Sequence, residues 1–149
     1  MKGRKLSRRS PRACQAAGIG YLPEDRYLHG IFLDLPNVDT MTAGILGRLG
    51  RPFISKKREN EVAAKYIDEL GIKVSSGAQV SRTLSGGNQQ KVVISKILSA
   101  GPNLVILDEP TRGVDAKARL DVYRLIRNLK KSGISVILIS SDLSEVIQE

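Results

Sequence analysis

Apolar residues recur along this chain with two different periods. From Ser55 to Leu70 they return every three to four positions, which predicts an amphipathic helix with Ser55 as its N-cap and Gly71 as its stop. The apolar stripe of this helix consists of Val62, Ala63, Tyr66, Ile67 and Leu70. Upstream, residues 18–23 favour a short strand that runs into a turn at Pro23, and a loop-rich stretch follows around residues 33–36.

The second half of the chain alternates helical and strand-like patterns more regularly. A helix is predicted from Ser85, its candidate cap, to Gly101–Pro102, and its inner face carries Val93, Ile94, Ile97 and Leu98. Another is predicted over residues 116–131, with Asp115 as its cap and a stripe formed by Ala118, Val122, Leu125, Ile126 and Leu129. Short continuous apolar runs at 103–108 and 134–139 are typical of strands buried on both faces. A final helix is predicted over residues 143–148.

The order strand, helix, strand from residue 103 to residue 139 predicts a parallel sheet and therefore an α/β fold. With 149 residues, 41% apolar and 26% charged, the chain has the size and composition of one modest globular domain. Its single cysteine excludes an internal disulfide, and one cysteine with one histidine argues against a structural zinc site. A reducing cytoplasm suits this cysteine usage.

The formal net charge of +9 is unevenly distributed, because six basic residues and no acidic ones lie within the first dozen positions. One interpretation is an arm that binds nucleic acid or an anionic membrane. The other is a solvated surface segment of a larger domain. Aromatic residues make up only 4% of the chain and none interleaves with these charges, so bases would find no stacking platform. We favour the surface segment and expect no nucleic-acid partner.

Two stretches carry candidate chemistry. The apolar run at 104–107 delivers Asp108 and Glu109 to the carboxyl end of a predicted strand, where open α/β sheets bind ligands. There Asp108 could hold Mg²⁺ and Glu109 could polarise an attacking water for catalysis. The alternative is a strand that ends in a solvated acidic turn.

The second stretch, Leu84-Ser-Gly-Gly-Asn-Gln89, places two glycines at the start of a predicted helix. Free backbone N–H groups of a first helical turn favour an anion. The Ser85 hydroxyl and the Asn88 and Gln89 amides would add further donors. The alternative is an ordinary helix cap with a flexible entry.

The spacing of the two stretches strengthens the functional interpretation of each. The glycine-led helix start lies about two dozen residues before the Asp108–Glu109 pair, and Pro110–Asp115 follows this pair directly. Together they resemble the signature motif, Walker B strand and D-loop of the nucleotide-binding domain of an ABC ATPase. Four motifs of the chain are similar to the second ATPase half of carbohydrate-type ABC importers, such as those for ribose, xylose, galactose and autoinducer 2. Their sequences are Tyr21-Leu-Pro-Glu-Asp-Arg26, Leu84-Ser-Gly-Gly-Asn-Gln-Gln-Lys91, Asp108-Glu-Pro-Thr-Arg-Gly-Val-Asp115 and Ile139-Ser-Ser-Asp142.

The resemblance implies a site that is shared between two ATPase halves facing each other head to tail. Ser85, Gly86, Gly87 and Gln89 would contact the γ-phosphate of ATP held by the other half. Asn88 and Asp115 would lie on the same nucleotide-facing surface, with Glu24 at the Q-loop position and Ser141 at the switch position. ATP and Mg²⁺ are the implied cofactors, with Asp108 as metal ligand and Glu109 in catalysis.

Three features depart from the general ABC pattern. The lysine-bearing phosphate loop, G-x-x-x-x-G-K-[ST], occurs nowhere in the chain. Glu24 replaces the Q-loop glutamine, and Ser141 replaces the switch histidine. The last two are features of the second half in carbohydrate importers, and they weaken a catalytic role for Glu109. We therefore expect an N-terminally truncated, partial P-loop NTPase domain without its Walker A strand and loop, with the neighbours of the Asp108 strand missing from the sheet.

By the same resemblance, residues 1–23 would begin the core, 24–100 would form an inserted helical subdomain with the signature helix, and 101–149 would hold the Walker B, D-loop and switch regions. The implied partners are the first ATPase half or a second copy, the transmembrane permease subunits and, indirectly, a periplasmic or extracellular sugar-binding protein. The implied location is the cytoplasmic face of the membrane, as a peripheral subunit for sugar uptake. The outward loop at residues 33–38 is the expected partner surface.

Two other hypotheses stay open from the sequence. The chain could be an inactive, truncated remnant, and without the lysine loop we expect no ATP hydrolysis by the isolated chain. It could also be a DNA-associated ABC-type head domain, a class that shares the signature helix and Walker B strand. The absence of coiled-coil heptads and the importer-like wording of the motifs disfavour the DNA-associated class.

Overall fold

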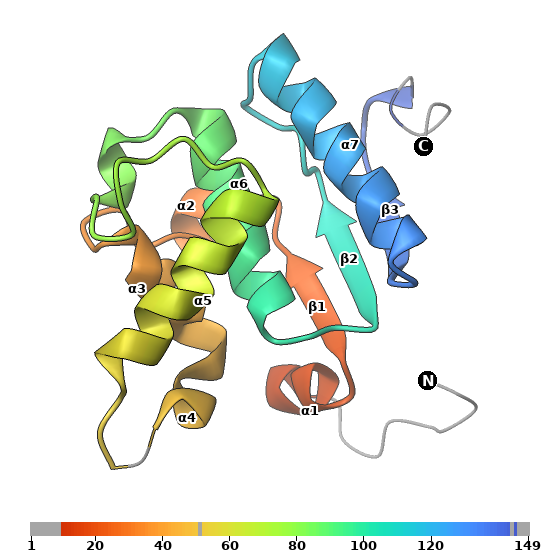
Figure 1. The fold of residues 1–149 in the computed structure, drawn as a ribbon. Coiled ribbons are helices and arrows are strands. Elements are labelled where there is room, and N and C mark those ends of the chain that lie inside the picture. The colour runs from red at the N-terminus through yellow and green to blue at the C-terminus, as the bar shows by residue number, and fades with distance from the viewer. Residues whose placement is uncertain (1–9, 51, 144, 146–149) are drawn as a thin grey trace.

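The computed structural model describes residues 10–50, 52–143 and 145. Its centre is a three-stranded parallel sheet in the order β1-β2-β3 (Figure 1). The strands are β1 (Ile19–Leu22), β2 (Leu104–Asp108) and β3 (Ser135–Ile139). Leu22 pairs with Leu107, and Asp108 pairs with Ile139 at the carboxyl end of the sheet. The predicted parallel α/β architecture is confirmed.

Helices and 3-10 turns make up the remaining regular structure of the described residues. They are α1 (Pro11–Ala16), α2 (Arg26–His29), α3 (Asn37–Thr42), η1 (Ala43–Ile45), α4 (Leu46–Leu49), α5 (Lys56–Glu69), η2 (Ser81–Thr83), α6 (Gly86–Ser99) and α7 (Ala116–Lys131). Helix α6 contacts α3, β1 and α7, and so stands between the smaller helices and the sheet (Figure 1). At the end of α6 that carries the two glycines, Gly86 lies close to Arg26 of α2 and Gly87 lies against Ala118 of α7.

The three long helices begin where the sequence predicted. The Ser55 hydroxyl accepts a hydrogen bond from the Arg58 N–H at 3.4 Å and caps α5, and the Asp115 carboxylate accepts one from the Ala118 N–H at 2.9 Å and caps α7. Ser85 occupies the cap position of α6 without capping it by its side chain. In this respect the expectation of a capping serine is wrong.

The hydrophobic core forms around α6. Val92, Val93 and Ile94 are at most 1% exposed, and they pack with Val105 and Leu107 of the central strand in one cluster. The apolar stripes of α5 and α7 join this cluster from either side. Burial of a contiguous apolar surface is the main stabilising contribution to such a domain.

Two expectations about the sheet are wrong. Strand β2 has both neighbours, although we expected its flanking strands to be missing. Strand β3, expected to be buried, lies at an edge of the described sheet and leaves Ile137 47% and Ile139 46% exposed. Helices α6 and α7 pack on the face that carries Val105 and Leu107, and the apolar run in β3 continues onto the other face.

Some predictions fall partly or wholly outside the described residues. Of the final helix, Leu143 and Glu145 are helical, and positions 144 and 146–149 lie outside the description. The basic positions 2–9 lie outside it as well. Across the described ranges, no helix has the length and apolar character needed to cross a bilayer.

Candidate functional site

The carboxyl end of β2 presents the predicted Asp108–Glu109 pair. Asp108 is half-buried, and its Oδ2 accepts a hydrogen bond of 2.8 Å from the hydroxyl of Tyr21 on β1. This hydrogen bond raises the pKa of Tyr21 above its ordinary value of 10.0, because the hydroxyl must keep its proton to donate it. The sequence did not predict Tyr21 as a site residue, although it lies within one of the quoted motifs.

Glu109 has an unusual backbone conformation, with a φ angle of 48°. A left-handed conformation in a residue other than glycine costs about 1 kcal/mol or more and occurs preferentially at functional sites. The Glu109 N–H donates to the Ile139 carbonyl at 2.9 Å, and its Oε1 accepts from the Ser141 N–H at 2.6 Å. The structure thus brings Glu109 and the switch position together, through the backbone of Ser141.

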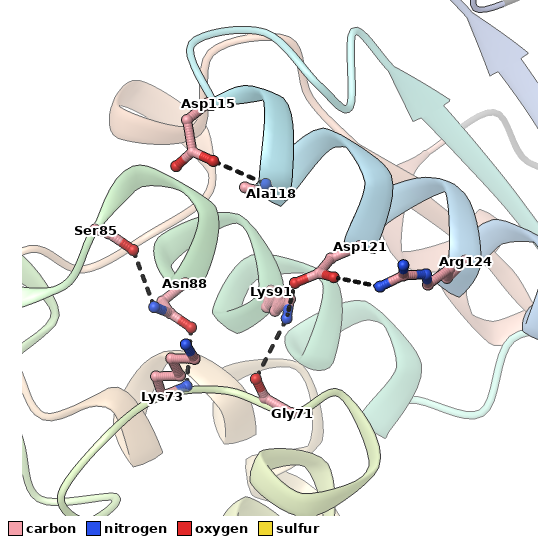
Figure 2. Close-up of polar contacts among 9 residues, drawn as sticks. All are labelled: Gly71, Lys73, Ser85, Asn88, Lys91, Asp115, Ala118, Asp121 and Arg124. Atoms are coloured by element: carbon pink, nitrogen blue, oxygen red, sulfur yellow. Dashed lines mark hydrogen bonds and ion pairs between the residues drawn. The ribbon is translucent and has the colours of Figure 1, made fainter.

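The start of α6 forms a second site, here called the signature turn (residues 85–88). Ser85 is exposed and Gly87 is buried. Because no side chain caps the helix, its first N–H groups keep their positive partial charge for another acceptor. Asn88 donates to the Ser85 hydroxyl oxygen at 2.9 Å, and its Oδ1 accepts from the Lys73 N–H at 2.8 Å (Figure 2). The Asn88 amide therefore braces the turn.

Asp115 lies beside the signature turn in the same chain, as Figure 2 shows. Both border a shallow pocket of about 140 Å³ between α6 and α7. The pocket is lined by Lys73, Ser85, Gly87, Asn88, Lys91, Asp115, Lys117, Ala118 and Asp121. The lining thus carries three lysines and two aspartates, and it is the uncapped start of α6 that makes this surface suitable for an anion.

A charge pair in the lining of this pocket ties the two helices together. The Lys91 Nζ lies 3.0 Å from Asp121 Oδ2 and also donates to the Gly71 carbonyl at 3.3 Å (Figure 2). The hydrogen bond from Lys91 holds the pKa of Asp121 below its ordinary value of 3.8. Lys91 and Asp121 lie on different helices, so no helical spacing in the sequence could have paired them.

Gln89 turns its side chain into the interior, whereas Glu24 is exposed beside the loop that precedes α7. The Gln89 side chain is buried, and its Nε2 donates to the Ser81 carbonyl at 3.2 Å. Glu24 forms an ion pair with Arg112 in the loop before α7. We therefore leave the Gln89 side chain out of the phosphate contacts proposed below and place Glu24 beside the D-loop.

The predicted site residues thus form two groups. Asp108, Glu109 and Ser141 meet at the end of the sheet, and residues 85–88 meet Asp115 at the start of α6. Within the ranges that the structure describes, no hydrogen bond or ion pair joins one group directly to the other.

The end of β2 offers Mg²⁺ one protein ligand, the carboxylate of Asp108. Asp108 offers a half-buried carboxylate with one oxygen already bonded to Tyr21. Among the described residues, no three or more histidine, cysteine or acidic side chains gather closely enough to hold a metal ion. Mg²⁺ commonly takes one or two carboxylates and completes its shell with phosphate and water. Asp108 would suit a magnesium ion that arrives with a nucleotide.

An α/β domain with an acidic pair at the end of its central parallel strand and an uncapped, glycine-led helix beside it is a partial nucleotide-binding cassette. The family model described as ABC transporter matches residues 1–112, and the chain belongs to this family. The fold is also that of the dimeric ATP-binding cassette MJ0796 in its post-hydrolysis state with ADP and Pi. That structure has a TM-score of 0.71 and 20% identity, and the likeness covers 93% of this chain and 59% of the other.

Three curated relatives are ATP-binding proteins of importers or transporters. The autoinducer 2 import ATP-binding protein LsrA of Enterobacter sp. (strain 638) is 48% identical over 86% of this chain. The ribose import ATP-binding protein RbsA 3 of Rhizobium etli and the galactofuranose transporter ATP-binding protein YtfR of Escherichia coli O157:H7 are 42% and 41% identical over 99% of it. The chain spans 25% to 30% of the length of these relatives.

Proposed function

We propose that this chain is part of the ATP-binding subunit of a sugar-type ABC importer and corresponds to its second ATPase half. In this role it lends its signature turn to the γ-phosphate of ATP held by another ATPase half. The observation that carries the proposal is the start of α6, where the helix begins at Gly86 without a side-chain cap. The 41% to 48% identity to importer and transporter ATP-binding proteins supports the assignment to sugar-type import.

The signature turn supplies three kinds of interaction to a terminal phosphate. The N–H groups of residues 86 and 87 point out of the first helical turn, and the helix dipole adds to their attraction for an anion. The Ser85 hydroxyl accepts a hydrogen bond from Asn88, so its own proton can be donated to a phosphate oxygen. Loss of the γ-phosphate after hydrolysis would remove these contacts and open the interface between the halves.

Asp108 and Glu109 would have a smaller role in this half. Asp108 suits a nucleotide-borne Mg²⁺, which would neutralise phosphate charge when bound. Glu109 holds the Ser141 N–H, and this bond fixes its carboxylate at the end of the sheet. Because the sequence contains no lysine-bearing phosphate loop, we expect the isolated chain to hydrolyse no ATP.

The permease subunits would dock on the segment around α2. Tyr27, Leu28, Phe32 and Leu35 expose between 44% and 74% of their surface there. The outward loop first expected at 33–38 is shorter than predicted, because Asn37 and Val38 are buried in the core. Docking on a permease would place the subunit at the cytoplasmic face of the membrane, with a sugar-binding protein reached only through the permease.

The proposal is tested by association with an ATPase half that carries a complete phosphate loop and a Glu→Gln change to block hydrolysis. With ATP and Mg²⁺, energy transfer between labels on the two halves should report closure. Ser85→Arg should weaken it by about tenfold or more, since it places a bulky side chain against the phosphate. Ser76→Arg, an exposed serine elsewhere, is the matched control and should close normally. Failure of the unchanged chain to close with ATP would contradict the proposal.

A further inference from the structure

The guanidinium of Arg26 is buried where three segments of the chain meet. Arg26 is the first residue of α2 and is only 7% exposed. Its Nη1 donates to the Arg112 carbonyl at 2.9 Å, and its Nη2 lies 3.3 Å from the Gly113 carbonyl. Both carbonyls belong to the loop before α7. One side chain thus holds the backbone of a loop about 90 positions further along the chain.

The same guanidinium borders the signature turn. A β-carbon on Gly86 would lie 3.1 Å from Arg26 Nη2 and 3.1 Å from the Gly113 carbonyl oxygen. A larger residue at position 86 would therefore press on both groups. Gly113 has a φ angle of 68°, which favours glycine, and its own β-carbon would stand 3.6 Å from the guanidinium. Gly86 therefore leaves the space that Arg26 fills, whereas position 113 favours glycine because of its backbone conformation.

Polar and aromatic groups, and no carboxylate, supply the hydrogen bonds of Arg26 among the described residues. Besides the two carbonyls, Nη2 donates to the Tyr27 hydroxyl at 2.9 Å, and the guanidinium carbon lies 4.6 Å from the centre of the Tyr27 ring. Its Nε is buried without a partner, and the nearby Glu24 pairs with Arg112 instead. Burying a cation of this kind costs free energy. If the side chain at position 26 only filled space, an apolar residue there would make the protein more stable.

We propose that Arg26 is a positioning residue that holds the loop at 112–113 against the signature turn and links both to α2. The forked guanidinium can bond two successive carbonyls at once, which the ammonium of a lysine cannot reproduce. The backbone of Arg26 is itself fixed, because its carbonyl accepts from the N–H groups of Gly30 and Ile31 at 2.9 and 2.8 Å. A displacement of α2 therefore moves the guanidinium, and with it the two glycines.

This link deepens the proposed function and rests on it, because α2 also carries the exposed side chains of Tyr27 and Leu28. A partner that presses on these side chains would shift the turn that is offered to the γ-phosphate. In the other direction, phosphate bound at the turn would hold α2 in one position. Arg26 would thereby couple partner docking to nucleotide-driven closure.

The first experiment measures amide hydrogen exchange in the full chain. Arg26→Met should speed exchange of the Arg112 and Val114 amides about tenfold, the scale expected when hydrogen bonds to a charged donor are lost. The amides of Val105 and Leu107 in the central strand should keep their rates, because a general loss of structure would speed them too. Arg48→Met is the matched control, since exposed Arg48 also donates to a backbone carbonyl, that of Ala100, at 3.0 Å.

The second experiment repeats the closure assay with the ATPase half described above. Arg26→Lys, which keeps the charge and loses the fork, should require about fivefold more ATP for half-maximal closure, while Arg48→Met should stay within about twofold. Arg26→Lys also replaces Arg26→Met in the exchange measurement should the latter fail to fold.

The outcomes separate the two proposals. If the unchanged chain does not close with ATP, the proposed function fails, and the exchange rates still decide whether Arg26 holds the loop. If the Arg26 variant used for the exchange measurement exchanges at 112 and 114 like Arg48→Met, the positioning role is overturned. If exchange there is faster but closure needs no additional ATP, the coupling to closure is overturned.

Discussion

Gly87 on α6 and Ala118 on α7 approach so closely that a β-carbon on Gly87 would lie 2.4 Å from the Cβ of Ala118. Real β-carbons do not approach a neighbour this closely, so the two helices can keep their spacing only with glycine at position 87. This contact lies in the lining of the pocket shared by the signature turn and Asp115. The second glycine of the turn therefore has a packing role in addition to its place in the glycine-led helix start that the sequence predicted.

Gly87→Ala should destabilise the protein by about 1–3 kcal/mol, the usual cost of inserting a methyl group into a filled interface. This outweighs the gain of at most about 1 kcal/mol that alanine brings to a helix. Gly77→Ala is the control, because a β-carbon there would meet Ala63 and Val38 at ordinary contact distances of 3.6 Å. Urea unfolding of both variants measures the difference. A Gly87→Ala variant as stable as Gly77→Ala would contradict the close contact.

The ion pair between Lys91 and Asp121 predicts a dependence of stability on pH. Because the pKa of Asp121 is held below 3.8 in the folded state, the folded protein binds fewer protons there than the unfolded chain. The stabilisation is therefore fully present above about pH 4 to 5 and is lost as the pH falls through the lowered pKa. Asp121→Asn removes it at every pH.

The free energy of unfolding of Asp121→Asn should fall about 1–2 kcal/mol below that of the unchanged chain near neutral pH. The gap should narrow as the pH drops below 3.8. Asp68→Asn, which changes an exposed carboxylate on α5, serves as the control and should leave stability nearly unchanged. Urea titrations at a series of pH values measure the gap. A gap that stays constant into the acid range would exclude Asp121 as its source.

Local signals explain which parts of the fold could be predicted from the sequence. The starts of α5 and α7 follow from Ser55 and Asp115, whose side chains cap the helices that directly follow them. The exposure of Ile137 could not be predicted, because an apolar run does not reveal which layers cover the strand. The contact between Arg26 and Gly113 was also inaccessible, since its acceptor is a backbone carbonyl 87 positions away. Every residue has a backbone carbonyl, so the residue type does not show which carbonyl accepts such a hydrogen bond.

Because one face of β3 is exposed, a polar substitution on that face should change the free energy of unfolding only slightly. Ile137→Thr should change the free energy of unfolding by about 0.5 kcal/mol or less, because its side chain is 47% exposed and threonine suits strands. Binding of a dye specific for apolar surfaces should decrease. Val105→Thr, the control at a fully buried position of the central strand, should cost about 1–3 kcal/mol for burying a hydroxyl. Equal losses in urea unfolding would show that β3 is covered as well as β2.

The hydrogen bond from Tyr21 to Asp108 predicts that the Tyr21 hydroxyl ionises at a higher pH than an ordinary tyrosine. The hydrogen bond that the Tyr21 hydroxyl donates to Asp108 stabilises its protonated form, and burial and the charge of Asp108 add to this, so the pKa of Tyr21 lies above 10.0. Asp108→Asn removes the negative charge and should lower this pKa towards 10.0. The measurement is an NMR titration of the tyrosine ring carbons, in which Tyr21→Phe identifies the signal.

Tyr66 is the internal control for this titration. Its pKa is also raised, but by burial first and by Glu69 second, so Asp108→Asn should leave it unchanged. A shift of both tyrosines together would indicate a general loss of structure. A Tyr21 signal that does not respond to Asp108→Asn would show that the hydrogen bond is absent in solution, and the Asp108 carboxylate would then have both oxygens free for a nucleotide-borne metal ion.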